Sequence, residues 1–286
     1  MTQQAGVDGV LPSGTDIKTI MDTWTLQKGF PLITVHRNYQ NGLIRFEQVG
    51  PETIRSRSNR LMALSSSQER FLRSNARHSI NSSDSTSNYR WWVPISFTDA
   101  DRKNFHENNT LPRLWLSPSL VEDSLQTEIS PTAWIVANVQ GSGFYRVNYD
   151  ERNWQLLNDQ MRKNHEAIHV LNRAHLISDA FALAEVNILP YSTPLGMIQY
   201  MKREAHNVPW ESATDALGYL NLMLKFTPHY GRFQVTTSCF PSRTVAHSLS
   251  LGRRVSSHRS LGPPWAGSDI SSETTKIQSL PGLDCC

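Results

Sequence analysis

WIVANVQGSGFYRVNYD, residues 134–150, is the stretch at which the character of the chain changes from β-rich to helical. It holds two runs of β-branched and aromatic residues, Trp134–Val139 and Phe144–Tyr149, separated by Gln-Gly-Ser-Gly. Such runs around a glycine-containing turn predict a β-hairpin. The second run alternates between two faces, as a half-buried strand does. Its face opposite Phe144 and Arg146 consists of Tyr145, Val147 and Tyr149.

Upstream of this stretch, short runs with strand character are separated by turn signals. Phe30–Val35 is one, and Pro31 places it at a strand start or a sheet edge, because proline lacks the ladder donor. Tyr89–Phe97 is another, with its apolar side chains on one face and Trp92 on the other. That face consists of Trp91, Val93 and Ile95. Several short strands of this kind predict a small antiparallel β-sandwich.

Downstream, the hydrophobic period changes to that of helices. A first helix would bury Trp154, Leu157 and Met161, and a second Ala174, Ile177, Phe181 and Ala184. A third starts near Thr193-Pro194, and a fourth runs over Pro209–Phe226 with Ala216, Tyr219, Leu220 and Met223 on one side. Successive helices joined by short loops predict an antiparallel helical array or solenoid. One more helix is expected at residues 15–28, capped by Thr15 or Asp16 and stopped at Gly29.

Three collinear motifs carry a family resemblance. They are MDTWTLQKGFPLITV (Met21–Val35), GFYRVNYD within the opening stretch, and NRAHLISDAFALA (Asn172–Ala184). Together they resemble the zinc aminopeptidases of the aminopeptidase N type. The resemblance spans roughly residues 5–228 and corresponds to the non-catalytic C-terminal half of that family.

The resemblance implies an α+β, multi-domain fragment. Residues 1–29 would be the end of the catalytic domain with its last helix, 30–150 the β-sandwich, and 151–228 the start of the C-terminal helical domain. Residues of about 49–68 are Arg/Ser-rich without a period and are interpreted as an irregular insertion. Residues 229–286 match nothing in the family and have the composition expected of disorder.

Composition limits the partners and the compartment. A net charge of +3, not gathered into a stripe, does not favour nucleic-acid binding. No apolar run approaches the roughly 20 residues of a membrane-spanning helix, and the N-terminus does not have the pattern of a signal peptide. Sequons at Asn81 and Asn108 predict possible N-glycosylation sites. They fit a family that is usually at the cell surface or secreted, with some cytoplasmic members.

One segment, HEAIH at residues 165–169, fits the zinc-binding pattern H-E-x-x-H. On a helix, His165 and His169 would share a face and Glu166 would activate a metal-bound water. A catalytic zinc needs a third protein ligand, and the position at which the family supplies a glutamate falls at Ile188. The family's segment for the substrate's amino terminus is also absent. We therefore interpret HEAIH as a coincidental match in a polar connection between helices, with two exposed histidines.

Other polar residues are assigned structural roles. A charged run is interpreted as a solvated loop; it consists of Asp99, Asp101, His106 and Glu107. Trp91-Trp92 is interpreted as core on one side and inter-domain contact on the other. Arg146 is expected to pair with a carboxylate at the sheet–helix boundary, and Asp179 with Arg173. A basic cluster near the C-terminus is too short to indicate nucleic-acid binding; it consists of Arg253, Arg254, His258 and Arg259.

Three functional hypotheses remain open. The first is a fragment resembling a zinc aminopeptidase that releases N-terminal residues from peptides, without catalytic or metal-binding residues of its own and inactive alone. The second is a non-catalytic interaction module that forms a homodimer or contacts peptides through the helical segment. The third is a new zinc hydrolase that uses His165 and His169. Under the first two hypotheses zinc is a cofactor of the full-length family and not of this chain.

Overall fold

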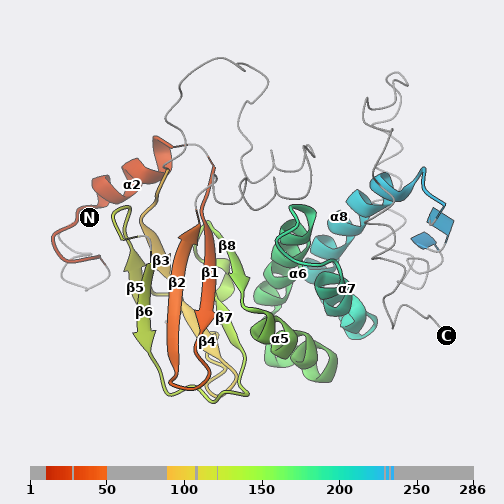
Figure 1. The fold of residues 1–286 in the computed structure, drawn as a ribbon, viewed down its shortest axis with the longest axis horizontal. Coiled ribbons are helices and arrows are strands. Elements are labelled where there is room, and N and C mark those ends of the chain that lie inside the picture. The colour runs from red at the N-terminus through yellow and green to blue at the C-terminus, as the bar shows by residue number, and fades with distance from the viewer. Residues whose placement is uncertain are drawn as a thin grey trace.

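The structure, a computed structural model, describes residues 11–27, 29–49, 89–106, 109–120, 122–228, 230–231 and 233–234. Strands lie on one side of the molecule, and helices α5, α6, α7 and α8 lie on the other (Figure 1). The predicted insertion at 49–68 lies outside the described residues except for Val49. The predicted tail at 229–286 lies outside them except for the last four described positions.

The predicted N-terminal helix is confirmed as α2 (Ile17–Thr25). Of the two candidate caps, Asp16 fills the role: its Oδ1 accepts a hydrogen bond from the backbone N–H of Thr19 at 2.7 Å. The indole Nε1 of Trp24 donates to the carbonyl of Trp92 at 3.0 Å. The helix therefore packs on the segment that enters the strand Val93–Ile95.

The largest sheet has four strands in the order β6-β2-β1-β8. Their bounds are β1 (Leu32–Arg37), β2 (Leu43–Val49), β6 (Glu122–Gln126) and β8 (Arg146–Tyr149). β2 is antiparallel to both β1 and β6, whereas β8 is parallel to β1. The prediction of a purely antiparallel fold is therefore wrong for this pair.

Two short antiparallel ladders complete the β part. β3 (Val93–Ile95) pairs with β5 (Leu114–Leu116), and β4 (Phe97–Asp99) pairs with β7 (Ile135–Ala137). The predicted inward face of the run Tyr89–Phe97 is confirmed, because Trp91, Val93 and Ile95 are all fully buried.

The hairpin predicted for residues 134–150 is wrong. Its first run forms β7, which pairs with β4, and its second forms β8, which pairs with β1. The intervening 3₁₀ turn η3 (Val139–Gly141) sends the chain away from β7, because Asn138 and Gln140 adopt positive φ angles of 57° and 54°. The alternation within the second run is nonetheless confirmed. Its predicted inward face is buried, namely Tyr145, Val147 and Tyr149.

The helices follow β8 directly, because Asp150 ends the strand and caps the next helix through a 2.9 Å hydrogen bond from the N–H of Asn153. The helical elements are α5 (Glu151–Asn164), η4 (His165–Ala167), α6 (Val170–Glu185), α7 (Ser192–Met197), η5 (Ile198–Arg203) and α8 (Asn207–Leu224). The predicted buried positions of the first two helices are confirmed. No helix of the described part of the chain is long and apolar enough to cross a membrane.

The predicted face of α8 is confirmed in part, because Leu220 is buried and Ala216 and Tyr219 pack against the core, but the most deeply buried face is a different one. Ala213, Leu217, Leu220 and Leu224 are buried, whereas Ala216, Tyr219 and Met223 are only half-buried. Several faces of this helix carry apolar residues, so its period does not select one. Trp210 fixes the rotation, because its buried indole donates to the carbonyl of Glu204 at 3.1 Å. One continuous cluster of buried side chains runs from β1 to α8.

Candidate functional site: the connection between α5 and α6

The HEAIH segment does not form one helix. His165 and Glu166 lie in the 3₁₀ turn η4, Ile168 is extended at φ −110° and ψ 130°, and His169 caps the start of α6. The H-E-x-x-H mechanism requires both histidines on one face of a continuous helix. The chain break at Ile168 removes that geometry, so these residues do not fit the zinc of the family.

The two histidines are also less exposed than predicted. His165 is 8% exposed, and its ring lies against Tyr200 with centroids 5.0 Å apart. Its Nδ1 is buried without a hydrogen-bond partner. His169 is half-buried, stacks on Phe105 at 6.1 Å, and accepts at Nδ1 from the N–H of Leu171 at 3.4 Å. The prediction of two exposed histidines is therefore wrong.

A buried ion pair lies beside this connection. Arg173 donates through Nε to Oε2 of Glu204 at 2.7 Å and through Nη2 to Oε1 at 3.0 Å, a bidentate geometry. The side chain of Arg173 is 4% exposed and that of Glu204 is 0%. Tyr200 Oη and the backbone N–H of His206 each add a 3.0 Å hydrogen bond to the carboxylate. The predicted pair of Arg173 with Asp179 is wrong.

The same guanidinium holds the backbone of the connection. Nη1 of Arg173 donates to the carbonyl of Ile168 at 2.7 Å and contacts that of His165 at 3.4 Å. Arg173 thus joins α6 to η4 on one side and to the end of η5 on the other. The cluster is a structural joint that fixes α6 relative to the α5–α6 connection and to the end of η5, next to the start of α8.

Burial and charge set the protonation states in this joint. Burial alone would raise the pKa of the Glu204 carboxyl, but hydrogen bonds led by those from Arg173 outweigh it and lower the pKa. Burial and the neighbouring Glu204 raise the pKa of Tyr200 above its ordinary range. Burial lowers the pKa of both His165 and His169 below the ordinary 6.5. At neutral pH the cluster is therefore a charged Arg–Glu pair flanked by neutral rings.

The position predicted to lack the third zinc ligand is Ile188, which is half-buried and packs against the core. Across the described ranges, no three His, Cys, Asp or Glu side chains come together in a group that could hold a metal ion. The charged groups of the joint are paired with one another and hydrogen-bonded to backbone groups. The role these contacts indicate is structural: they hold α6, the connection before it and the end of η5 together, and this cluster is called the clamp below.

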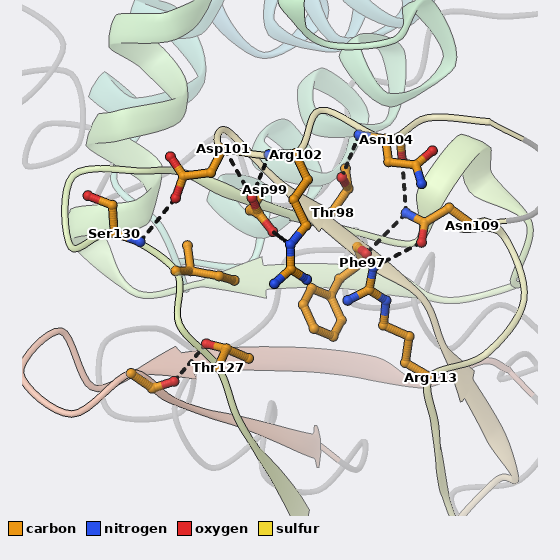
Figure 2. Close-up of polar contacts among 12 residues, drawn as sticks. Phe97, Thr98, Asp99, Asp101, Arg102, Asn104, Asn109, Arg113, Thr127 and Ser130 are labelled. Carbon is orange, nitrogen blue, oxygen red and sulfur yellow. Dashed lines mark hydrogen bonds and ion pairs between the residues drawn. The ribbon is translucent and has the colours of Figure 1, made fainter.

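The charged run at residues 99–107 is partly a core element. Asp99 is fully buried, and its Oδ1 accepts from the backbone N–H groups of Asp101 at 3.0 Å and Arg102 at 2.9 Å, as Figure 2 shows. Its Oδ2 lies 3.9 Å from Nε of Arg102. Asp99 therefore shapes the turn after β4, which corrects its assignment to a solvated loop; Asp101 and His106 are exposed as predicted.

Further along this loop, Asn109 is 8% exposed and donates to the carbonyl of Asn104 at 2.8 Å. Arg113 donates to Oδ1 of Asn109 at 3.0 Å and lies 4.5 Å above the ring of Phe97 (Figure 2). The glycosylation sites predicted at Asn81 and Asn108 lie outside the described residues, as do Glu107 and the basic cluster at 253–259. These assignments remain predictions.

A second ion pair joins the sheet to the helices, as predicted for Arg146. Nη1 of Arg146 donates to Oδ1 of Asp179 at 2.7 Å, and the backbone N–H of Val147 donates to Oδ2 at 3.0 Å. Asp179, on α6, therefore satisfies an amide on the free edge of β8. Neither this pair nor the Glu204 clamp has a local sequence signature, because the partners are 33 and 31 residues apart.

Comparisons with known proteins agree with this architecture. The family model described as the ERAP1-like C-terminal domain matches residues 134–241. Aminopeptidase N of Plutella xylostella is 34% identical over 221 residues, covering 76% of this chain and 20% of the relative. The thyrotropin-releasing hormone-degrading ectoenzyme of Rattus norvegicus is 33% identical, covering 76% and 18%. Human aminopeptidase N is 32% identical, covering 76% and 19%.

The β part and the helices that follow it thus correspond to the C-terminal region of a class of peptidases. Within that class, the chain belongs to the aminopeptidase N type family. It spans about a fifth of the length of the curated relatives that it matches.

Proposed function

We propose that this chain is a non-catalytic part of a zinc aminopeptidase that releases N-terminal amino acids from peptides. In this proposal the β part and the helices support the catalytic domain and help to enclose its peptide cavity, and the chain alone does not hydrolyse peptides. The observation that carries the proposal is the match of residues 134–241 to the ERAP1-like C-terminal domain. The HEAIH geometry supports it, because the two histidines lie on different elements.

Finer features of the family belong to the same proposal. We place the domain limits at 1–29, 30–150 and 151–228, with the β part as a sandwich and the helices as the start of a solenoid-like array. The packing of α6 against α7 and α8 supports the array. The name of one relative includes the word ectoenzyme, and together with the sequons this supports a cell-surface or secreted location.

The purified chain is expected to bind less than about 0.1 zinc per molecule and to leave a panel of aminoacyl amides unhydrolysed. The reason is that a catalytic zinc needs three protein ligands and an open position. Metal content measured by mass spectrometry and release of the amide chromophore check this. One zinc per chain, with activity lost in His165→Ala but kept in His106→Ala, would instead establish the zinc-hydrolase hypothesis. Full-length aminopeptidase N serves as the positive control.

A second candidate function, an interaction module, is favoured by the end of α8. Leu222 is 64% exposed and Phe226 is 87% exposed. They lie four residues apart, and exposed apolar side chains that form one patch mark contact sites, whereas single ones do not. If this surface forms a homodimer, the chain should sediment as a dimer at about 10 μM, and Leu222→Glu with Phe226→Glu should return it to a monomer. Analytical ultracentrifugation separates these outcomes. A monomer at every concentration tested would exclude the homodimer but leave the support role untouched.

A further inference from the structure

The α5–α6 connection carries two histidines, and its backbone carbonyls contact one buried cation, Arg173. His165 and His169 both precede α6, and the backbone carbonyls of His165 and Ile168 accept from the guanidinium of Arg173. The carboxylate that balances Arg173 comes from Glu204, at the end of η5. A change of charge on either ring therefore acts directly on the joint between the helices.

The structure offers no hydrogen-bond acceptor for a second proton on the ring of His165. Its Nδ1 is buried and lacks an acceptor, so the neutral ring carries its proton on Nε2. Protonation would create a buried N–H donor without a partner and would put a cation in a largely buried site, and both are unfavourable. The ring of Tyr200, at 5.0 Å, makes a favourable stack with the neutral form.

The charged groups near His165 are of both signs, and the one near His169 is positive. Arg173 of α6 and Arg203 of η5 both oppose a positive charge on His165. Glu204 favours such a charge but is already paired with Arg173, and Glu166 on η4 itself is exposed. For His169 the neighbouring charge is again Arg173.

We propose that the connection between α5 and α6 is an acid-responsive joint, in which protonation of His165 and His169 releases the Arg173–Glu204 clamp and loosens α6 from η5 and α8. The neutral rings at neutral pH keep the joint closed. The proposal concerns the chain itself and does not depend on the parent enzyme's activity.

The direction of the pH effect follows from linkage. Both histidines have pKa values below 6.5 in the closed state and regain ordinary values when the joint opens. The open state then binds more protons, so the closed state loses stability as the pH falls through about 6.5. Each unit of lowered pKa corresponds to a tenfold change in the opening equilibrium. Loss of the Glu204 charge is a separate event below its ordinary 4.5, because its pKa is lowered.

Hydrogen–deuterium exchange of the full chain at pH 7.5 and 5.5, corrected for intrinsic exchange rates, tests the joint. Peptides covering residues 165–173 and 198–206 should lose at least about threefold in protection at pH 5.5. This is less than the tenfold change that one full unit of lowered pKa would allow. Peptides from β1 and β2 should not change. The variant His165→Phe with His169→Asn should remove the pH dependence. Phenylalanine keeps the stack on Tyr200, and asparagine keeps a cap acceptor.

The matched control is His106→Asn, because its side chain is exposed and the variant should keep the loss of protection at pH 5.5. Equal protection at both pH values in the wild-type chain, or an unchanged pH dependence in His165→Phe with His169→Asn, would overturn the proposal. Nitrogen NMR of the labelled wild-type chain needs no variant. It should show His165 as a neutral ring with its proton on Nε2 at pH 7.5; a neutral ring with its proton on Nδ1 would also overturn the proposal.

Discussion

Glu204→Ala is expected to lower the free energy of unfolding of the helical part by about 3–5 kcal/mol, because it leaves the guanidinium of Arg173 buried without its counter-charge. The Glu204 side chain is 0% exposed and accepts four hydrogen bonds, so water does not replace it easily. Urea unfolding followed by far-UV circular dichroism measures the loss.

Two further variants separate charge from shape at this position. Glu204→Gln keeps the volume and an acceptor for Tyr200, so most of the loss should persist if the buried charge of Arg173 is the cause. Asp159→Ala breaks an exposed pair with a single contact of the same length, 2.7 Å to Arg162, and should cost less than about 1 kcal/mol. Equal losses in Glu204→Ala and Asp159→Ala would contradict the clamp.

A double variant with apolar side chains separates the ion pair from the hydrogen bonds of Arg173 to the backbone. Arg173→Leu with Glu204→Leu removes both charges, and such replacements of buried pairs are often close to neutral. Here the double variant should still lose stability, because the carbonyls of Ile168 and His165 lose the donor that Arg173 supplies. It should nevertheless be more stable than the sum of the two single losses predicts.

The hydrophobic period predicted which residues are buried within a single helix or strand. The first two helices bury the predicted residues, from Trp154 to Ala184, and β8 buries the predicted alternate positions. In the helix Glu151–Asn164 one face is apolar and the other polar, so the period determines the orientation, whereas α6 is buried on most sides. In α8 apolar residues occur on several faces, and the contact of Trp210 with Glu204 helps to fix which one turns inward.

The hydrophobic period could not predict which strands pair, because the pairing strands are far apart in the sequence. Strand composition predicted that residues 134–150 contain two strands, but not that β7 pairs with β4 and β8 with β1. Likewise the spacing of His165 and His169 suits a helix, whereas Asn164 ends α5 and accepts from the N–H of Glu166 at 3.1 Å to start the 3₁₀ turn. Local capping thus removed the metal geometry that the pattern alone suggested.

Asn138→Ala is expected to cost about 2–5 kcal/mol, because one residue both adopts the strained turn conformation and satisfies its backbone. Asn138 is 2% exposed and has a φ of 57°. Its amide donates to the carbonyls of Gly143 at 2.9 Å and Tyr145 at 3.2 Å, and its Oδ1 accepts from the N–H of Gly143 at 2.8 Å. Thermal unfolding and the yield of folded chain measure the effect.

Asn138→Gly and Asn187→Ala divide that cost into its two causes. Glycine tolerates a positive φ, so Asn138→Gly should recover about 1 kcal/mol relative to alanine while still losing the side-chain hydrogen bonds. Asn187 has a φ of 59° but is exposed, so its alanine variant should lose only the conformational contribution, about 1 kcal/mol. If Asn138→Ala cost no more than Asn187→Ala, the hydrogen bonds would not stabilise the turn. A larger cost that glycine only partly relieves would mean that the side chain of Asn138 directs β8 away from β7 and toward β1.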